Sequence, residues 1–183
     1  ARNVISASFN GTTVETTTAL TTDGSLILYT WNNEEGKKAF WHSTSHVMAQ
    51  VIEEFYPGCK LTIGPAIDNG FYYDVDFGDE KLTDADFKRV EDRVLEISRE
   101  KHEFKMRSAT KAEALELYKD NEFKTELITN LEDGTITFCD HSTFTDLCRG
   151  GHIPNTGIIK AMKILSVAGA YWRGNEKKKK LTR

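Results

Sequence analysis

The chain has 183 residues, 39% of them hydrophobic, and a net charge of −4 from 24 basic and 28 acidic side chains. These values are ordinary for a globular protein of one or two small domains, and the slightly negative charge disfavours a protein that binds nucleic acid on its own. No apolar run approaches the roughly 18 residues that a membrane-spanning helix needs, so we expect no membrane contact. The three cysteines are too few for a disulfide framework, which fits a reducing, cytoplasmic environment.

Residues 1–39 are predicted to form short strands joined by tight turns. The run 4–9 is strand-like and is followed by Asn10-Gly11, a strong signal for a hairpin turn. Residues 32–38 are polar and contain a glycine, which indicates a linker. Because so few residues bury too little apolar surface to fold alone, we expect this part to lean on the rest of the chain.

Three helices are predicted in the remainder of the chain. Apolar residues recur at helical spacing over 43–56 and stop at Pro57-Gly58. Thr83 is expected to cap a second helix, with Asp86 three residues later in the place of a capping box. Thr110 is expected to cap a third helix.

Strands are predicted around these helices. The aromatic and β-branched run 71–77 lies between glycines, and the runs 125–128, 135–138 and 160–167 are also strand-like. The basic run 173–183 is interpreted as a solvated tail or linker. Because helices and strands are grouped more than alternated, the predicted class is α+β, with a mainly antiparallel sheet and packed helices.

His42 and His46 form the first candidate site. They are four residues apart at the start of a predicted helix, so they project from one face and can share a ligand or a water molecule. The spacing alone is weak, because such pairs are often accidents of a helix surface. No glutamate follows His42, so the common zinc-protease pattern is absent.

Cys148 and His152 form the second candidate site. They flank Gly150-Gly151, where a backbone turn can bring the thiol and the imidazole to one place. Asp146 would face the same side of the sheet as Cys148 if both lie in one strand. A buried cysteine beside a turn histidine is an equally weighted interpretation of this pair.

The two pairs together make a complete four-ligand set of the kind that binds zinc: His42, His46, Cys148 and His152. They could equally form a polar pocket that positions a water molecule without a metal. Both interpretations stay open on the residues alone.

Other polar residues are less distinctive. Lys124 begins a predicted strand, where a lysine is more often exposed than functional. Tyr72 and Tyr73 fit sheet packing, although strand alternation leaves one of them free to face a pocket. His102 and His141 are interpreted as ordinary surface or capping residues.

Four longer strings of residues occur in order: His42-Ser43-Thr44-Ser45-His46, Ile63-Gly64-Pro65-Ala66 with 69–74, Asp146-Leu147-Cys148-Arg149-Gly150-Gly151-His152 with Pro154-Asn155-Thr156, and Ala168-Gly169-Ala170-Tyr171-Trp172-Arg173-Gly174. They resemble the N-terminal editing region of threonyl-tRNA synthetase, with related cores in alanyl-tRNA synthetase and free-standing alanyl-tRNA deacylases. The last string favours the threonine enzyme, in which it normally leads into the catalytic domain.

The resemblance implies a division of the chain. Residues 1–39 would be a partial TGS-like (β-grasp) β segment and linker, and 40–183 an editing domain that ends in a basic linker. The start of the chain has no signal-peptide pattern and is expected to be a cut within a larger protein. The ligase catalytic domain would follow Arg183, so we expect this chain neither to activate threonine nor to charge tRNA.

The resemblance also implies a set of site residues. The catalytic members are His42, Lys124, His46, Cys148 and His152, and the substrate-binding members are Asp146 and Tyr73. One departure is visible, because Gly151 stands where many family members have proline. This makes the turn looser but removes no functional side chain.

The implied activity is hydrolysis of mischarged Ser-tRNA(Thr) by water attack on the aminoacyl ester, with no cofactor required and zinc as the alternative. The implied partners are the tRNA(Thr) acceptor end carrying serine, and the aminoacylation and anticodon-binding domains of a full-length synthetase. The alternatives are an alanyl-type deacylase and a zinc-stabilised, non-catalytic tRNA-binding module. Whether His42 or Lys124 is the general base stays open.

Overall fold

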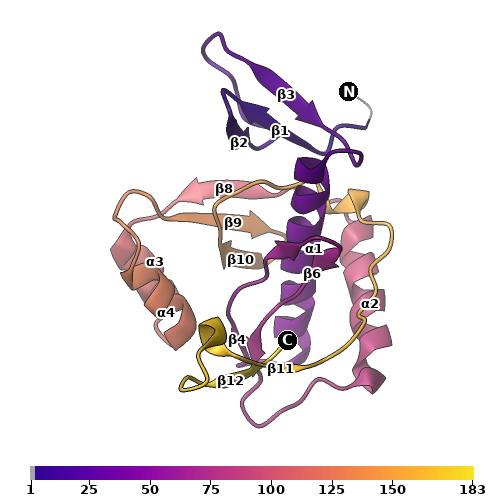
Figure 1. Cartoon of the computed structure of the whole chain (residues 1–183), viewed down its shortest axis with the longest axis vertical. Coiled ribbons are helices and arrows are strands. Elements are labelled where there is room, and N and C mark those ends of the chain that lie inside the picture. The colour runs from indigo at the N-terminus through magenta and orange to yellow at the C-terminus, as the bar shows by residue number, and fades with distance from the viewer. Residues whose placement is uncertain (1–2) are drawn as a thin grey trace.

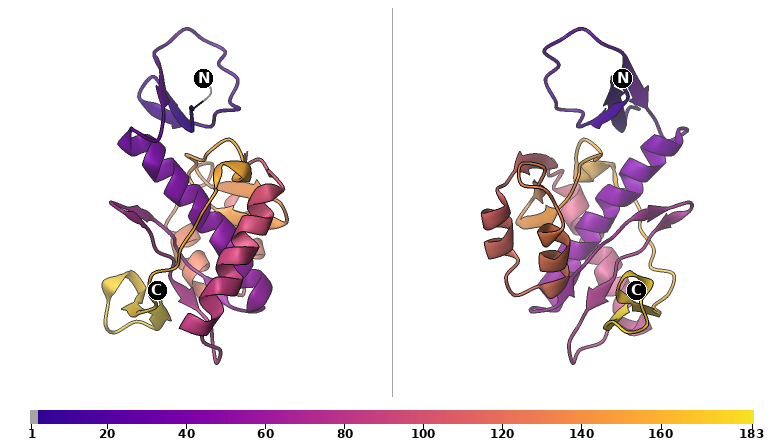
Figure 2. Two further views of the ribbon diagram at one scale, coloured as in Figure 1. Left: turned by 90° about the vertical axis from the view of Figure 1, so that its right-hand side faces the viewer. Right: turned by 60° about the vertical axis from the view of Figure 1, so that its left-hand side comes forward.

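A three-stranded antiparallel sheet forms the N-terminal part of the computed structural model, which describes residues 3–183 (Figure 1). The sheet has the order β2-β1-β3, and its strands are β1 (Ser6–Phe9), β2 (Thr12–Val14) and β3 (Leu26–Tyr29). The predicted hairpin turn is confirmed, because Asn10 and Gly11 both have positive φ angles, 49° and 77°, as such a two-residue turn requires. The sheet sits at one end of the molecule, beyond the main body (Figure 2).

One long helix, α1 (Glu34–Phe55), leads from this sheet into the body of the protein. The linker expected at 32–38 is therefore wrong, because α1 begins within it. Asn33 takes the N-cap position, and the carboxylates of Glu34 and Glu35 lie in the first turn, where they interact favourably with the helix dipole. The boundary expected after residue 39 falls inside α1. The identification of residues 1–39 with a TGS module stays a prediction.

Two further helices begin where the sequence predicts. α2 (Asp84–Arg99) packs beside α1 (Figures 1 and 2). The Asp86 carboxylate accepts hydrogen bonds from the backbone N–H and the hydroxyl of Thr83, both at 2.9 Å, which confirms the capping box. α3 (Lys111–Leu117) begins after Thr110, which also forms a capping box.

Antiparallel sheets complete the α+β fold that the sequence predicts. One has the order β10-β9-β8, with β8 (Lys105–Ser108), β9 (Thr137–His141) and β10 (Phe144–Leu147). A second has the order β11-β12-β7-β4, with β4 (Lys60–Leu61), β7 (Val75–Asp76), β11 (Gly169–Tyr171) and β12 (Lys180–Thr182). The remaining pair is β5 (Ala66–Ile67) with β6 (Gly70–Phe71), and the short 3-10 helices are η1 (Thr156–Ile158) and η2 (Trp172–Gly174).

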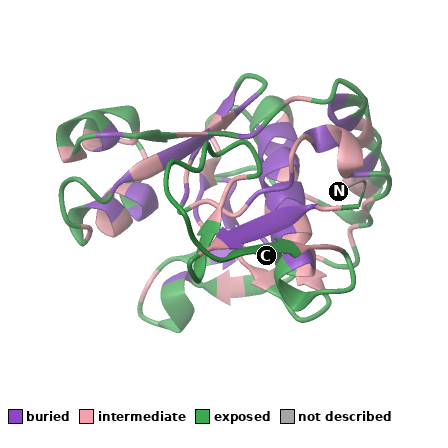
Figure 3. Cartoon of the chain, turned by 90° about the horizontal axis from the view of Figure 1, so that it is seen from above, coloured by how far each residue is buried: buried purple, intermediate pink, exposed green. Residues whose placement is uncertain are grey.

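Buried positions concentrate on α1 and the strands around it, whereas outlying turns and loops are exposed (Figure 3). The largest group of buried apolar side chains includes Val47, Val51 and Ile52 of α1 together with Val90 and Val94 of α2. The middle of α1 therefore lies within the core. Among residues 3–183, no helix is long and apolar enough to cross a membrane.

Three of the predicted strands are wrong in detail. Residues 125–128 lie in α4 (Glu122–Thr129), because the side chain of Asn121 accepts hydrogen bonds from the backbone N–H groups of Phe123 and Lys124 and caps a helix there. Residues 71–77 are divided between two short strands. No strand forms within 160–167, where the backbone N–H of Ile164 donates instead to the carboxylate of Glu91 at 2.9 Å.

The C-terminal basic run is also not a free tail. Part of it forms β12, and its side chains pair with acidic residues of the body. Lys178 binds Glu126 at 2.8 Å, and Arg183 binds the buried Asp74 at 2.7 Å. A run of basic residues predicts a solvated segment. Composition alone does not reveal which carboxylates the fold brings near the run.

Candidate functional site

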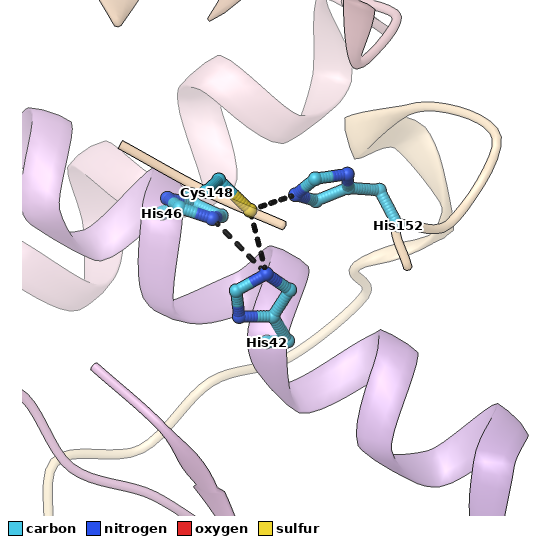
Figure 4. A group of neighbouring side chains, drawn as sticks. All are labelled: His42, His46, Cys148 and His152. Carbon is cyan, nitrogen blue, oxygen red and sulfur yellow. Dashed lines mark hydrogen bonds between the residues drawn. The ribbon is translucent and has the colours of Figure 1, made fainter. Parts of the chain in front are cut away.

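α1 supplies His42 and His46 to a cluster inside the fold (Figure 4). One helical turn separates them, so their ring centroids lie 4.6 Å apart and their Nε2 atoms 3.3 Å apart. His46 is buried and His42 is partly exposed. The structure thus brings the first predicted pair together on one face.

Cys148 and His152 complete this cluster (Figure 4). Cys148 follows β10, and the chain returns across Gly150 and Gly151, whose φ angles of 94° and 91° are rare for residues with a side chain. The turn places the Cys148 Sγ 3.4 Å from the His152 Nε2 and 3.1 Å from the His42 Nε2. Two motifs far apart in the sequence therefore share one site.

A buried carboxylate lies behind the histidines. Asp146 Oδ1 accepts a hydrogen bond from the Lys124 ammonium at 2.5 Å, and Oδ2 accepts one from the Tyr73 hydroxyl at 2.9 Å. The His46 Nδ1 lies 3.1 Å from the same Oδ2, although the contact is poorly aligned for a hydrogen bond. Burial raises the pKa of Asp146, but the charge of Lys124 and the contacts with His46 outweigh it and hold that pKa below its usual range. Asp146 is therefore ionised, and both of its oxygens have internal partners.

The protonation states of the cluster follow from burial and mutual contacts. Burial raises the pKa of the Cys148 thiol, but the surrounding imidazoles outweigh this effect and lower it to about 3. Burial lowers the pKa of His152, but contacts with Cys139, Cys148 and Glu15 outweigh this and raise it to about 12. Burial holds the pKa of His42 below its usual value. At neutral pH the cluster combines a thiolate, a charged His152 and a neutral His42.

Glu15, the residue directly after β2 of the N-terminal sheet, also reaches the cluster. Its Oε1 accepts a hydrogen bond from the backbone N–H of Gly151 at 2.8 Å and lies 3.1 Å from the His152 Nδ1. Its Oε2 accepts from the backbone N–H of His152 at 3.2 Å. Nothing in the Thr-rich sequence around Glu15 indicates a contact with a loop 137 residues away.

The interpretation of His141 as a surface or capping residue is wrong. The side chain is buried between Phe104 and Phe144, with ring centroids 5.0 and 5.4 Å away, and burial is the largest cause that lowers its pKa to about 3. The polar neighbour Asp140 suggested exposure, but successive residues of a strand point to opposite faces. His102 is partly exposed and contacts Glu100, as expected of a surface histidine.

A cleft of about 1150 Å³ opens beside the cluster. Its lining comes from the N-terminal sheet, α1, residues 63–66, the α4 region and residues 147–151, and includes Lys38 and Arg149. His42 and Cys148 line this cleft, whereas Lys124 is buried behind them. Tyr73 lies directly beneath Gly64 of the cleft wall, where an added Cβ would be 2.2 Å from the tyrosine ring. Of the four clustered residues, His42 and Cys148 are thus the two that line the cleft.

The donor atoms of the four-residue cluster suit zinc. Usual zinc bond lengths in a tetrahedron put two nitrogens about 3.3 Å apart and nitrogen and sulfur about 3.5 Å apart. The measured separations are 3.3 Å between His42 and His46, and 3.1 and 3.4 Å from Cys148 to His42 and His152. Carboxylates also lie behind His46 and His152, as they commonly do behind metal-ligating histidines. The same distances suit a hydrogen-bonded cluster without metal, so both alternatives fit the geometry.

The sequence of this chain is similar to those of known proteins. Residues 136–183 match the family model described as Threonyl and Alanyl tRNA synthetase second additional domain. The resemblance to threonyl-tRNA synthetase is confirmed. The whole chain aligns with proteins named threonine–tRNA ligase, at 80% identity in Flavobacterium psychrophilum, 80% in Flavobacterium johnsoniae and 52% in Parabacteroides distasonis. The chain spans about 28% of the length of these relatives, and the segment it matches carries an editing-type domain.

Proposed function

We propose that this chain is a proofreading domain that hydrolyses Ser-tRNA(Thr) by water attack on the aminoacyl ester. The observation that carries the proposal is the position of His42. It is neutral, lines the cleft beside Cys148, and is backed by a buried network of fixed charges. A neutral imidazole at a cleft surface is suited to general-base catalysis at neutral pH.

In the proposed mechanism, His42 takes a proton from a water molecule as the water oxygen attacks the ester carbonyl carbon. The bond from that carbon to the ribose oxygen then breaks, and His42 returns the proton to the leaving ribose oxygen. His46 lies next to His42 and has its pKa raised, mainly by Asp146 and Cys148 against the effect of burial. In its protonated form, His46 would offset the negative charge that develops on the carbonyl oxygen. Cys148 shapes the site and needs no acyl intermediate.

Lys124 takes a supporting role in this mechanism. Its ammonium is buried and bound to Asp146, and it does not line the cleft, so His42 is the better candidate for the base. Asp146 is a predicted substrate-binding residue, and a carboxylate would suit the ammonium group of the substrate. Because both of its oxygens have internal partners, the substrate could use Asp146 only by sharing it with Lys124 or Tyr73.

A second, hydrolytic site is needed because serine differs from threonine only by the absence of one methyl group. One carbon provides roughly 1–3 kcal/mol of discrimination in a synthetic site. A pocket that admits a seryl group and collides with a threonyl group supplies the missing selectivity. The negative net charge suggests that the aminoacylation and anticodon-binding domains of a complete synthetase supply most of the affinity for tRNA(Thr).

Zinc is the alternative cofactor. His42, His46, Cys148 and His152 would hold it, and a bound zinc ion would lower the pKa of a bound water molecule. We propose that serine release needs no metal and takes place in the cytoplasm.

The test is release of serine from Ser-tRNA(Thr), with Thr-tRNA(Thr) and Ser-tRNA(Ala) measured beside it, in EDTA and with added zinc. Release from Ser-tRNA(Thr) alone that survives EDTA supports the proposal. Preferred cleavage of Ser-tRNA(Ala) would indicate an alanyl-type deacylase. A folded protein that releases nothing, and that unfolds when EDTA is added, would indicate a zinc-stabilised binding module.

A further inference from the structure

We propose that Glu15 is a positioning residue for His152, so that the N-terminal sheet completes the site by fixing which ring nitrogen faces Cys148. The kinetic part of this inference rests on the proposed function, whereas its structural part does not. Glu15 acts through His152 and is not among the residues that line the cleft.

The carboxylate is bound through both oxygens. Oε1 contacts the backbone N–H of Gly151 and the ring Nδ1 of His152, while Oε2 contacts the backbone N–H of His152. The side chain of Glu15 is only 14% exposed and that of His152 is fully buried. Two successive backbone N–H groups and one ring nitrogen therefore converge on a single, partly buried carboxylate, an arrangement typical of an anion-binding backbone nest.

The packing around His152 shows why such a contact is needed. Its ring is stacked between Phe104 and His42, at centroid distances of 5.1 and 5.0 Å and interplanar angles of 9° and 26°. Stacking fixes the plane of the ring, but a half-turn that exchanges its two edges leaves that plane unchanged. The other polar neighbour of Nδ1 is the Cys139 Sγ, at 3.8 Å. Glu15, at 3.1 Å, is the stronger acceptor. It therefore decides that Nδ1 faces Glu15 and that Nε2 faces Cys148.

Gly151 makes this contact possible. A proline has no backbone N–H, and its ring fixes φ near −65°, so it could neither donate to Glu15 nor adopt the φ of 91° found here. The glycine is therefore more than a loosening of the turn, because it supplies the donor and the backbone conformation that seat Glu15.

The experiment compares Glu15→Ala and Glu15→Gln with wild type, using Asp23→Asn as the matched control. Asp23 is an exposed carboxylate in the same N-terminal part, away from the cleft. Long-range ¹H–¹⁵N spectra of the histidine rings report the hydrogen bond at the His152 Nδ1 directly. Single-turnover release of serine from Ser-tRNA(Thr), measured over a range of protein concentrations, separates the rate constant from apparent tRNA affinity.

We expect Glu15→Ala to change the ring ¹⁵N shifts of His152 and to lower the rate constant roughly 10- to 100-fold, the size of effect found when the carboxylate behind a metal-ligating histidine is removed, with tRNA affinity unchanged. Glu15→Gln should restore part of the rate, because an amide oxygen can still accept from the ring and the backbone. Asp23→Asn should match wild type in both measurements.

The outcomes separate this inference from the proposed function. If wild type releases no serine but its spectra show a protonated Nδ1 that is perturbed in Glu15→Ala, the proposed function fails and the positioning role stands. If wild type is active and Glu15→Ala leaves the spectrum of His152 and the rate unchanged, the inference is overturned. Should Glu15→Ala fail to fold, Glu15→Gln answers the same question, and unaltered His152 shifts together with an unaltered rate in that variant would again overturn it.

Discussion

Two carboxylate–histidine contacts border the cluster, and they are built differently. Asp146 contacts the Nδ1 of His46 from within the body of the protein, where Lys124 and Tyr73 also bind it. Glu15, just after β2, contacts the Nδ1 of His152, and its carboxylate is held in place by the backbone N–H groups of Gly151 and His152. Both contacts are about 3.1 Å long. The Asp146 contact belongs to a network of buried charges, whereas the Glu15 contact joins the N-terminal part of the chain to the turn at Gly151.

The difference shows two ways in which a fold can fix an imidazole. The Asp146 side is a structural necessity, because removing the carboxylate leaves a buried ammonium without its partner. The Glu15 side depends on how the N-terminal sheet meets the rest of the chain. We therefore expect the Asp146 contact mainly to determine the stability of the fold, and the Glu15 contact mainly to determine the orientation of the His152 ring.

The largest effect on stability is expected for Asp146→Asn. The substitution leaves the Lys124 ammonium buried beside a neutral amide, which should cost about 3–5 kcal/mol in the free energy of unfolding. Urea unfolding followed by circular dichroism measures it. Asp140→Asn is the matched control on the neighbouring strand, since its charged partner Arg107 is exposed, such a pair contributes about 1 kcal/mol or less, and an amide oxygen can still accept from the Thr145 hydroxyl. Equal costs for the two substitutions would contradict the distinction drawn between the two carboxylates.

A smaller effect is expected for the pair Glu15 and Gly151. Glu15→Ala and Gly151→Pro each remove the same hydrogen bond, so their costs should not add, and the double variant should show a coupling of about 0.5–3 kcal/mol. The same urea measurements on the two single variants and the double variant give this value. Simple additivity would mean that the two residues act independently and that Gly151 has no part in seating Glu15.

The smallest effect is expected in the dependence of stability on pH. The folded-state pKa of Asp146 is lowered, so its ionised form stabilises the protein above the unfolded value of about 3.9, and this contribution is lost as the pH falls through the lower folded-state pKa. The difference in stability between wild type and Asp146→Asn should therefore not shrink between about pH 7 and pH 5, where the loss of the Asp146 contact that raises the pKa of His46 can only enlarge it, and it should shrink below about pH 4. A difference that shrinks already between pH 7 and pH 5 would mean that Asp146 is not held ionised by its partners.

The sequence predicts Asp146 and the four clustered residues, but it does not predict Glu15. Asp146, Cys148 and His152 lie in one short string, and His42 and His46 share one helix face, so local spacing and the resemblance locate them. Glu15 escapes prediction because its role comes only from the docking of a distant sheet. His141 escapes because an alternating strand pattern does not say which face is buried.

Helix and strand prediction failed where local capping or long-range pairing decides the outcome. Residues 125–128 have strand-like composition, but the Asn121 cap starts the helix α4 there. Lys124 therefore lies on a helix, and its ammonium reaches Asp146. The C-terminal basic run looked solvated until the fold supplied Glu126 and Asp74 as partners. In contrast, the Thr83 and Thr110 capping boxes depend on residues only three positions away and were predicted correctly.

The central claim is that His42, at the cleft surface between these two supported histidines, activates the attacking water. The most direct test is single-turnover release of serine from Ser-tRNA(Thr) by His42→Ala, with His102→Ala as a surface control. We expect His42→Ala to lower the rate roughly 10²- to 10⁴-fold with the fold retained, and His102→Ala to match wild type. A folded His42→Ala protein that releases serine at the wild-type rate would contradict the account.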